Sequence, residues 1–229
     1  MFIPHREVWK RQPQVAVGID WSNSITSNLF DAWSASDGWI SATKLHPLSI
    51  PSSVLNTVNR DGKTALLPNS ASMNCTLRRS FNSGSAGRSV LVLCEVPQSG
   101  LDSYDVVASF DTGAATAARI QVSSNAAQWA AYDGANVLDG GVVVPGKRTC
   151  VVGTFGGPGS SCYVDGKLVA SQGLNSTALT ATSLYVGGYG GQDAAWWSGT
   201  ISLVVAFNRV LSATEVASIS ANPWQIFAP

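Results

Sequence analysis

Charged side chains are scarce in this chain. Asp, Glu, Lys and Arg make up 12% of its 229 residues, where a globular protein usually carries about 25%. The 14 basic and 14 acidic side chains cancel, so the net charge gives no general attraction to nucleic acid or to an anionic membrane. Long apolar runs are missing too, since no stretch approaches the roughly 18 residues of a membrane span. We therefore expect neither nucleic acid nor a membrane among the partners.

Two further patterns are absent: a secretory signal and a cysteine motif. Residues 1–7 lack the apolar run of a signal peptide, which favours synthesis in the cytoplasm. The cysteines are Cys75, Cys94, Cys150 and Cys162. No two of them form a Cys-x-x-Cys pair, and most lie in apolar segments typical of strands. They are therefore predicted to be buried free thiols.

Catalytic groups are also few. Enzymes that cleave glycans use a pair of carboxylates, in some β proteins at alternate positions of one strand. The only glutamates are Glu7, Glu95 and Glu215; Glu95 has no acidic neighbour two or four residues away, and Glu215 suits a helix cap. The only histidines are His5 and His46, and there is no Gly-x-Ser-x-Gly turn to present a nucleophile. We therefore predict no catalytic residue and no enzymatic activity.

Metal-binding patterns are equally sparse. No His-Glu-x-x-His segment occurs, which argues against a zinc hydrolase. Several aspartates in predicted loops or at strand ends could supply oxygen ligands for calcium; they are Asp102, Asp105, Asp111, Asp133 and Asp139. Isolated loop aspartates more often form turns. We therefore predict no cofactor and no metal, with calcium as the open alternative.

The segments that are present indicate a β protein. Hydrophobic residues make up 45% of the chain, with eight Trp. Runs rich in β-branched residues, separated by Gly, Asn, Asp and Pro, predict strands over 88–96, 105–110, 119–122, 147–155, 162–170, 183–187 and 200–207. The connections are too short for helical crossovers, so the strands are expected to pair antiparallel. Asp165-Gly166 is typical of a tight turn and lies within the predicted segment 162–170.

One helix and one irregular segment complete the pattern. Ser212 and Glu215 have the spacing of a capping box, and the helix is expected to stop at Asn222-Pro223. Residues 1–60 carry tryptophans without periodicity. They are predicted to form an N-terminal arm or wrapping segment, followed by a single body over 61–229. The alternative is that these tryptophan rings cover their own chain.

Four segments in order resemble a known family. They are Tyr163-Val164-Asp165-Gly166-Lys167, Leu184-Tyr185-Val186-Gly187-Gly188, Trp197-Ser198-Gly199-Thr200-Ile201, and Phe207-Asn208-Arg209-Val210-Leu211-Ser212 with Glu215. Together they resemble the laminin-G-like, concanavalin A-like jelly roll over roughly residues 80 to 220. The resemblance implies an all-β, antiparallel two-sheet sandwich, here with an extended N-terminal arm and one short C-terminal helix.

The two ends of the chain carry a second resemblance, which bears on the function. The segment Trp9-Lys10-Arg11 with Val17-Gly18-Ile19-Asp20-Trp21, and the closing Asn222-Pro223-Trp224, resemble the ends of such proteins from tailed bacteriophages. That resemblance implies a non-enzymatic structural protein of the virion that decorates the capsid and contacts the major capsid protein. Aromatic surplus in a neutral chain predicts a homo-oligomer, for example a trimer. Attachment residues would be Trp9, Lys10, Arg11, Trp21 and Trp33.

The alternative function is a receptor- or glycan-binding module on a tail fibre or baseplate. Sugar rings stack on exposed aromatic side chains, and aromatic residues cluster beside a glycine-rich loop together with amide and carboxyl groups. The candidate residues are Tyr189, Gln192, Asp193, Trp196 and Trp197. Because consecutive strand residues point to opposite faces, one of the two tryptophans is expected to enter the core. For the same reason Trp129 and Tyr132, three apart, cannot form one platform.

Overall fold

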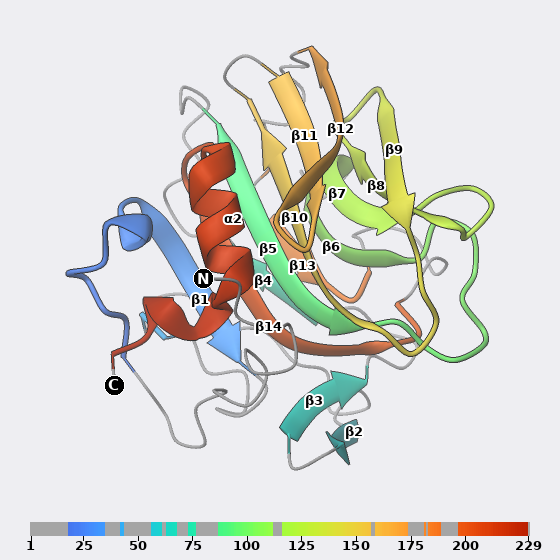
Figure 1. Ribbon diagram of the computed structural model, residues 1–229, viewed down its shortest axis with the longest axis horizontal. Coiled ribbons are helices and arrows are strands. Elements are labelled where there is room, and N and C mark those ends of the chain that lie inside the picture. The colour runs from blue at the N-terminus through green and yellow to red at the C-terminus, as the bar shows by residue number, and fades with distance from the viewer. Residues whose placement is uncertain are drawn as a thin grey trace.

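The computed structural model describes residues 18–34, 42–43, 56–60, 63–67, 73–76, 87–111, 116–156, 159–173, 181, 183–188 and 197–228. Within these residues two antiparallel sheets pack face to face as a sandwich, with one α-helix outside it (Figure 1). This is the predicted all-β, concanavalin A-like architecture. No helix of the described part is long and apolar enough to cross a membrane.

The larger sheet has eight strands. Along its main path the order is β12 (Lys167–Gly173), β11 (Gly159–Val164), β10 (Arg148–Phe155), β5 (Arg88–Glu95), β14 (Thr200–Phe207), β3 (Lys63–Leu67) and β2 (Asn56–Arg60), and β1 (Leu29–Ser34) also pairs with β14. β5 lies at its centre between β10 and β14, although β14 follows β5 by more than a hundred residues in the chain.

The smaller sheet has six strands. Their order is β4 (Met73–Thr76), β13 (Ser183–Val186), β6 (Val106–Asp111), β7 (Thr116–Val122), β8 (Gln128–Tyr132) and β9 (Val137–Val142). From β6 to β9 each strand pairs with the next in sequence, so this part is a simple meander. β13 returns from later in the chain to pair with β6 and β4.

The main core lies between the two sheets. Alternate residues of each strand point inward, including Val92 of β5, Phe110 of β6 and Trp129 of β8, all of which are fully buried. The rings of Trp129 and Trp197 lie 5.7 Å apart at their centroids, and Phe110 meets Phe155 edge to face. Large aromatic side chains therefore fill the space between the sheets and set their separation.

A second core covers the other face of the larger sheet. Leu91 and Leu93 of β5 point away from the main core and pack with Val205 and Phe207 of β14. Apolar residues of α2 (Ala213–Ala221) and of the short 3-10 helix η5 (Pro223–Ile226) cover them. Figure 1 shows α2 on the side of the larger sheet away from β7 to β9. Because both faces of its central strands are covered, these strands are continuously apolar instead of alternating.

α2 begins as the sequence predicts. The Ser212 side chain accepts a hydrogen bond from the backbone N–H of Glu215, and the Glu215 carboxylate accepts one from the backbone N–H of Ser212. This reciprocal pair is a capping box, which satisfies two donors at the start of the helix. The helix ends at Ala221, directly before the predicted stop at Asn222-Pro223.

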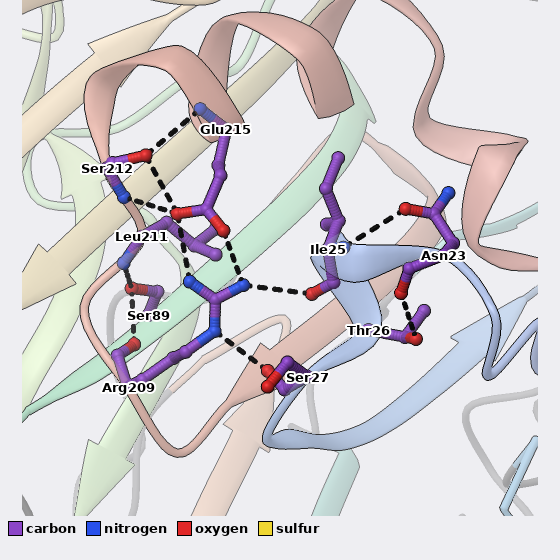
Figure 2. Close-up of polar contacts among 9 residues, drawn as sticks. All are labelled: Asn23, Ile25, Thr26, Ser27, Ser89, Arg209, Leu211, Ser212 and Glu215. Atoms are coloured by element: carbon purple, nitrogen blue, oxygen red, sulfur yellow. Dashed lines mark hydrogen bonds and ion pairs between the residues drawn. The ribbon is translucent and has the colours of Figure 1, made fainter.

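Arg209 ties this helix start to the N-terminal part of the chain (Figure 2). Its guanidinium donates to the Glu215 carboxylate, with nitrogen–oxygen distances of 2.7 and 2.9 Å. It also donates to the backbone carbonyls of Ile25 and Ser27, at 3.0 and 2.7 Å, at and beside the 3-10 helix η2 (Ser24–Thr26). One side chain therefore joins residues that lie more than 180 positions apart in sequence.

The strand predictions are confirmed from residue 88 onward, with boundaries shifted by a few residues. The predicted strand 162–170 is two strands, β11 and β12, joined by the turn that Asp165-Gly166 indicated. Both turn residues have positive φ, 51° and 80°, as a two-residue hairpin turn requires. The three cysteines with described side chains, Cys94, Cys150 and Cys162, are buried free thiols. Burial raises the pKa of Cys150 and Cys162 to about 12, so both stay protonated.

The predicted boundary at residue 60 needs correction. β1 lies within the proposed arm of residues 1–60, yet it pairs with β14 in the larger sheet, and all six of its residues are buried. β2 also falls before residue 61 and pairs with β3. These segments belong to the body because their strands complete the edge of the sheet beside β14. The part of the arm over 1–17 lies outside the described residues.

The end strands β9 and β12 of the two sheets lie side by side at one edge of the sandwich. Gly140 of β9 faces the backbone of Val169 in β12. A Cβ atom at Gly140 would lie 2.3 Å from the Val169 carbonyl oxygen, well inside any real contact. Glycine is therefore required at this position for the sheets to meet.

Gly140→Ala is expected to lower the free energy of unfolding by about 1–3 kcal/mol, because β9 must shift away from β12 to make room. The matched control is Gly173→Ala in β12, where a Cβ meets nothing within 4 Å. The control should leave stability unchanged or raise it by up to about 1 kcal/mol. Urea unfolding followed by tryptophan fluorescence measures both; equal effects of the two substitutions would contradict the close approach.

The Arg209–Glu215 pair predicts a specific pH dependence. Hydrogen bonding from Arg209 lowers the pKa of Glu215 from 4.5 to about 2. Because the folded-state pKa is the lower one, the stabilisation is complete above about pH 4.5 and is lost as the pH falls towards 2. The Glu215 side chain is 29% exposed, so solvent screening limits the effect to about 1–2 kcal/mol. Urea midpoints measured from pH 2.5 to 7 should fall less steeply in Glu215→Gln; identical slopes would disprove this role.

Candidate functional site

The predicted sugar-binding cluster falls largely outside the described residues. Tyr189, Gln192, Asp193 and Trp196 all lie there, so their part of the hypothesis stays a prediction. Trp197 is described, and it is fully buried between the sheets against Trp129. Its ring has no free face for a sugar. Trp197 is therefore the core member of the Trp196–Trp197 pair and leaves the candidate cluster.

The predicted attachment residues divide in a similar way. Trp9, Lys10 and Arg11 lie outside the described residues. Trp33, in β1, is fully buried in the main core beside Phe30, so it is corrected from an attachment residue to a core residue. Trp21 is 63% exposed and remains available at the surface. Attachment to other virion proteins, the virion location and self-association all stay predictions.

Asp105 and Asp133, two of the aspartates considered for calcium, accept hydrogen bonds within the chain. Asp133 accepts hydrogen bonds from the backbone N–H groups of Ala135 and Asn136, which is a turn-forming role. Asp105 accepts from the Ser198 hydroxyl at 3.0 Å, and burial raises the pKa of Asp105 to about 6. Asp102, Asp111 and Asp139 do not join them: within the described ranges no three acidic, His or Cys side chains gather as metal ligands would. The prediction that no cofactor binds stays untested.

Two of the three glutamates also have structural partners. Glu95 accepts a hydrogen bond from the Arg148 guanidinium at 2.9 Å, and their strands β5 and β10 are paired at this position. Glu215 is held by Arg209 and by the start of α2. The two carboxylates are therefore paired with different cations: Glu95 with Arg148 of β10, and Glu215 with Arg209 in the connection between β14 and α2.

A polar and aromatic row crosses the outer face of the smaller sheet. Strand register aligns Tyr185 of β13 with Ser109 of β6, Ser109 with Arg119 of β7, and Arg119 with Tyr132 of β8. Their neighbours in sequence, among them Phe110, Ile120, Ala131 and Leu184, point into the main core. Since side chains alternate along a strand, the row faces away from the core.

Gln121 lies one position further along the same face of β7. It pairs across the sheet with Ala130 of β8. The side chain is fully buried, yet neither its amide nitrogen nor its amide oxygen has a hydrogen-bond partner. Buried amides are nearly always satisfied, and an unsatisfied one calls for an explanation. We refer to Tyr185, Ser109, Arg119, Tyr132 and Gln121 together as the outer-face band.

Contacts within the band fix its geometry. The Arg119 guanidinium carbon lies 4.6 Å from the centre of the Tyr132 ring, within cation–π range. The Tyr132 hydroxyl donates to the carbonyl of Gly134 at 2.8 Å, so the ring is fixed by this hydrogen bond and by the guanidinium over its face. The Ser109 hydroxyl lies within hydrogen-bonding distance of Asp111 and of the Gly188 carbonyl. The band is therefore preorganised by the residues of the sheet and its turns.

Exposure rises across the band from β6 towards β9. Ser109 and Gln121 are fully buried, Arg119 and Tyr132 are half-buried, and Val137 of β9, which pairs with Tyr132, is 42% exposed. A ligand therefore meets the partly buried Arg119–Tyr132 pair before Ser109 or Gln121. An aromatic ring next to a fixed guanidinium provides apolar contact and directed donors, a combination that suits polyhydroxylated molecules.

The sequence analysis did not identify this band. Its members are spread over 109–185 and carry no motif. A partial signal was present, because Arg119 and Gln121 alternate with Ile120 and Val122 in the predicted strand 119–122, which indicates one polar face. The placement of Trp129 and Tyr132 on opposite faces was also expected, and the structure confirms it. The sequence pattern did not indicate which strands lie beside each other in the sheet.

Solved structures with this fold include carbohydrate-active proteins. The chain aligns with Trypanosoma rangeli sialidase in complex with the inhibitor DANA at a TM-score of 0.69 and 16% identity, covering 98% of this chain and 38% of the sialidase. It therefore spans well under half of that enzyme. It also aligns with the binding domain of Paraclostridial Mosquitocidal Protein 1 at a TM-score of 0.66 and 13% identity, covering 88% and 54% of the two chains.

A third structure matches over nearly its whole length. It is domain 4 of AbnA, a GH43 extracellular arabinanase from Geobacillus stearothermophilus, in complex with arabinotriose, with a TM-score of 0.64 and 12% identity. The alignment covers 84% of this chain and 98% of that domain. At these identities the likeness shows the fold alone. The search of curated proteins found no match.

Sequence comparison assigns the family directly. The resemblance expected over roughly 80 to 220 is confirmed, because a family model matches residues 80–217, more than half of the chain. The matched range begins before β5, ends within α2 and includes strands of both sheets. The chain belongs to the concanavalin A-like lectin/glucanases superfamily.

Proposed function

We propose that this protein is a non-catalytic glycan-binding module and that the outer-face band is its binding surface. The observation that carries the proposal is the row Tyr185–Ser109–Arg119–Tyr132, in which four neighbouring strands place aromatic and polar side chains in register on one face. The two tyrosines and Arg119 are partly exposed, and Ser109 is buried between them. A row of this kind follows the surface of an extended chain of sugars, with rings for stacking and a guanidinium for hydroxyl or carboxylate groups.

The comparisons support a binding role over a catalytic one for a unit of this size. The arabinanase domain that matches over 98% of its length is a separate domain of an enzyme, in complex with a trisaccharide. The sialidase likeness covers only 38% of that enzyme. In this chain, Glu95 and Glu215 serve an ion pair and a helix cap, so neither is presented as one of two carboxylates flanking a glycosidic bond.

The proposal corresponds to the alternative function derived from the sequence, moved to different residues. The loop that contains Tyr189 and Trp196 was expected to bind the sugar. The band lies instead on strands, where side chains are held more rigidly than on loops. Placement on a tail fibre or baseplate was implied by the resemblance of the chain ends alone and is not needed for this proposal.

Arg119→Met is expected to weaken glycan binding about tenfold or more, because it removes charged donors beside Tyr132 while keeping an apolar side chain. A glycan array of the full chain would first identify a ligand, and isothermal titration would then give the two dissociation constants. The control is Lys167→Met, which removes an exposed cation from β12 in the other sheet. No glycan bound by the parent protein, or equal affinity in the Arg119 variant, would disprove the proposal.

Gln121→Met tests whether the buried, unpaired amide beneath the band lowers stability without contributing to binding. The buried amide of Gln121 forms no hydrogen bond. An apolar side chain of similar shape should therefore raise the free energy of unfolding by about 1 kcal/mol. The same substitution should leave glycan affinity unchanged, because the amide is fully buried and does not reach the surface. Denaturant unfolding and titration measure the two effects. A loss of stability would mean that the amide is satisfied within the fold.

A further inference from the structure

A groove lies on the opposite side of the sandwich from the outer-face band. It has a volume of about 590 Å³ and is bounded by β10, β11 and β12 of the larger sheet and by residues 210–213, where the chain leaves β14 and enters α2. The size falls within the range of small-molecule sites, about 300–1,000 Å³. α2 packs beside this groove on β10, where the Cys150 thiol lies 3.5 Å from the Ser220 hydroxyl; Figure 1 shows β11 and β12 following β10 in the same sheet.

A row of three hydroxyl groups forms the floor of this groove. Strand register aligns Thr154 of β10 with Ser161 of β11, and Ser161 with Ser171 of β12. The next residues along β10 and β11, Phe155 and Cys162, point into the main core between the sheets. Thr154, Ser161 and Ser171 therefore share the face that looks towards α2.

Tyr163 lies two residues beyond Ser161 on the same strand and the same face. Its ring packs into the second core, and it also lines the groove. Thr154 and Tyr163 are nine-tenths buried or more, with 2% and 7% of their surfaces exposed. Among the described residues, the side chains of Thr154, Ser161, Tyr163 and Ser171 neither give nor accept a hydrogen bond.

The opposite wall offers no charge to a ligand. Of its polar side chains, Ser212 is already engaged, because its hydroxyl bonds to Glu215 within the capping box. Glu215 in turn is neutralised by Arg209, as Figure 2 shows. Val210, Leu211 and Ala213 supply apolar surface. No side chain that lines the described groove is charged, so it would not compensate the desolvation of a charged ligand.

We propose that this groove is a second ligand site and that it binds a neutral saccharide. A sugar residue has hydroxyl groups that pair with Thr154, Ser161 and Ser171, and an apolar ring face that packs on Tyr163 and Leu211. The described side chains along the groove carry no charge, which distinguishes it from the outer-face band with its Arg119. The two sites share no residue, so either can fail without the other.

The test uses the full chain and a panel of neutral trisaccharides, namely arabinotriose, maltotriose and cellotriose, with sialyllactose as the charged comparison. Amide chemical shifts in two-dimensional NMR locate binding. We expect at least one neutral trisaccharide to shift Thr154, Ser161, Tyr163 and Ser171 saturably. Binding of none of the neutral probes, or shifts confined to other residues, would overturn the proposal, as would binding of sialyllactose alone at the groove.

Variants then test which hydroxyl groups of the groove contact the saccharide. The combination Thr154→Val, Ser161→Ala and Ser171→Ala keeps the shape of the floor and removes its hydroxyls, and should raise the dissociation constant at the groove about tenfold or more. Tyr163→Phe, which removes only one hydroxyl, is the safer second variant if the triple change lowers stability, and should weaken binding severalfold. Val142→Ala, at an exposed position of β9 in the other sheet, should leave groove binding unchanged. Unaltered affinity in both groove variants would refute the site.

Discussion

The structure depends on one constraint: the central strands of the larger sheet are apolar on both faces and must be covered on both. Val90 and Val92 of β5 face the smaller sheet, while Leu91 and Leu93 face α2 and the chain ends. Apolar side chains on the second face would otherwise stand in water, at a cost of about 25 cal/mol for each Å² exposed. A sandwich of two sheets alone would leave that second face bare.

That requirement explains the role of the segments outside the sandwich. Residues near both ends of the chain, including Ile25, Ile219 and Trp224, share the second core. An isolated bridge between Ile19 and Phe227 and the hydrogen bonds of Arg209 hold these segments together. The N-terminal segment and α2 are therefore one cover, made from opposite ends of the chain. Arg209 can join them because it lies just after the end of β14, between the N-terminal segment and the start of α2.

Both proposed binding surfaces lie where this covering stops. The groove opens where α2 no longer overlies β10 to β12, so hydroxyl groups take the positions that apolar side chains occupy under the helix. The outer-face band lies on the smaller sheet, whose inner face supplies the core and whose outer face carries Arg119, Gln121 and Tyr132. The two surfaces differ in charge, which gives them different ligand preferences on the same scaffold.

Much of the fold could be predicted from residues 88 onward. Strand composition, the Asp165-Gly166 turn and the Ser212–Glu215 cap are local signals, and each is encoded within a few neighbouring residues. Trp33 and Trp197 show the limit of such signals. A tryptophan among polar residues has the same local pattern whether it faces solvent or a core, and both of these rings are buried by strands distant in sequence.

The sequence by itself therefore determined the class of fold, its antiparallel strands, its turn and its helix. Only the tertiary structure decided which strands are neighbours, and hence which side chains meet. Ser109 and Tyr185 are 76 positions apart, yet they are paired, and Thr154 and Ser171 lie in one row through β11. Register between distant strands is set by the packing of both cores, because slipping a strand by one residue would turn its apolar side chains outward. The candidate sites consist of such register-dependent rows, so no local pattern could reveal them.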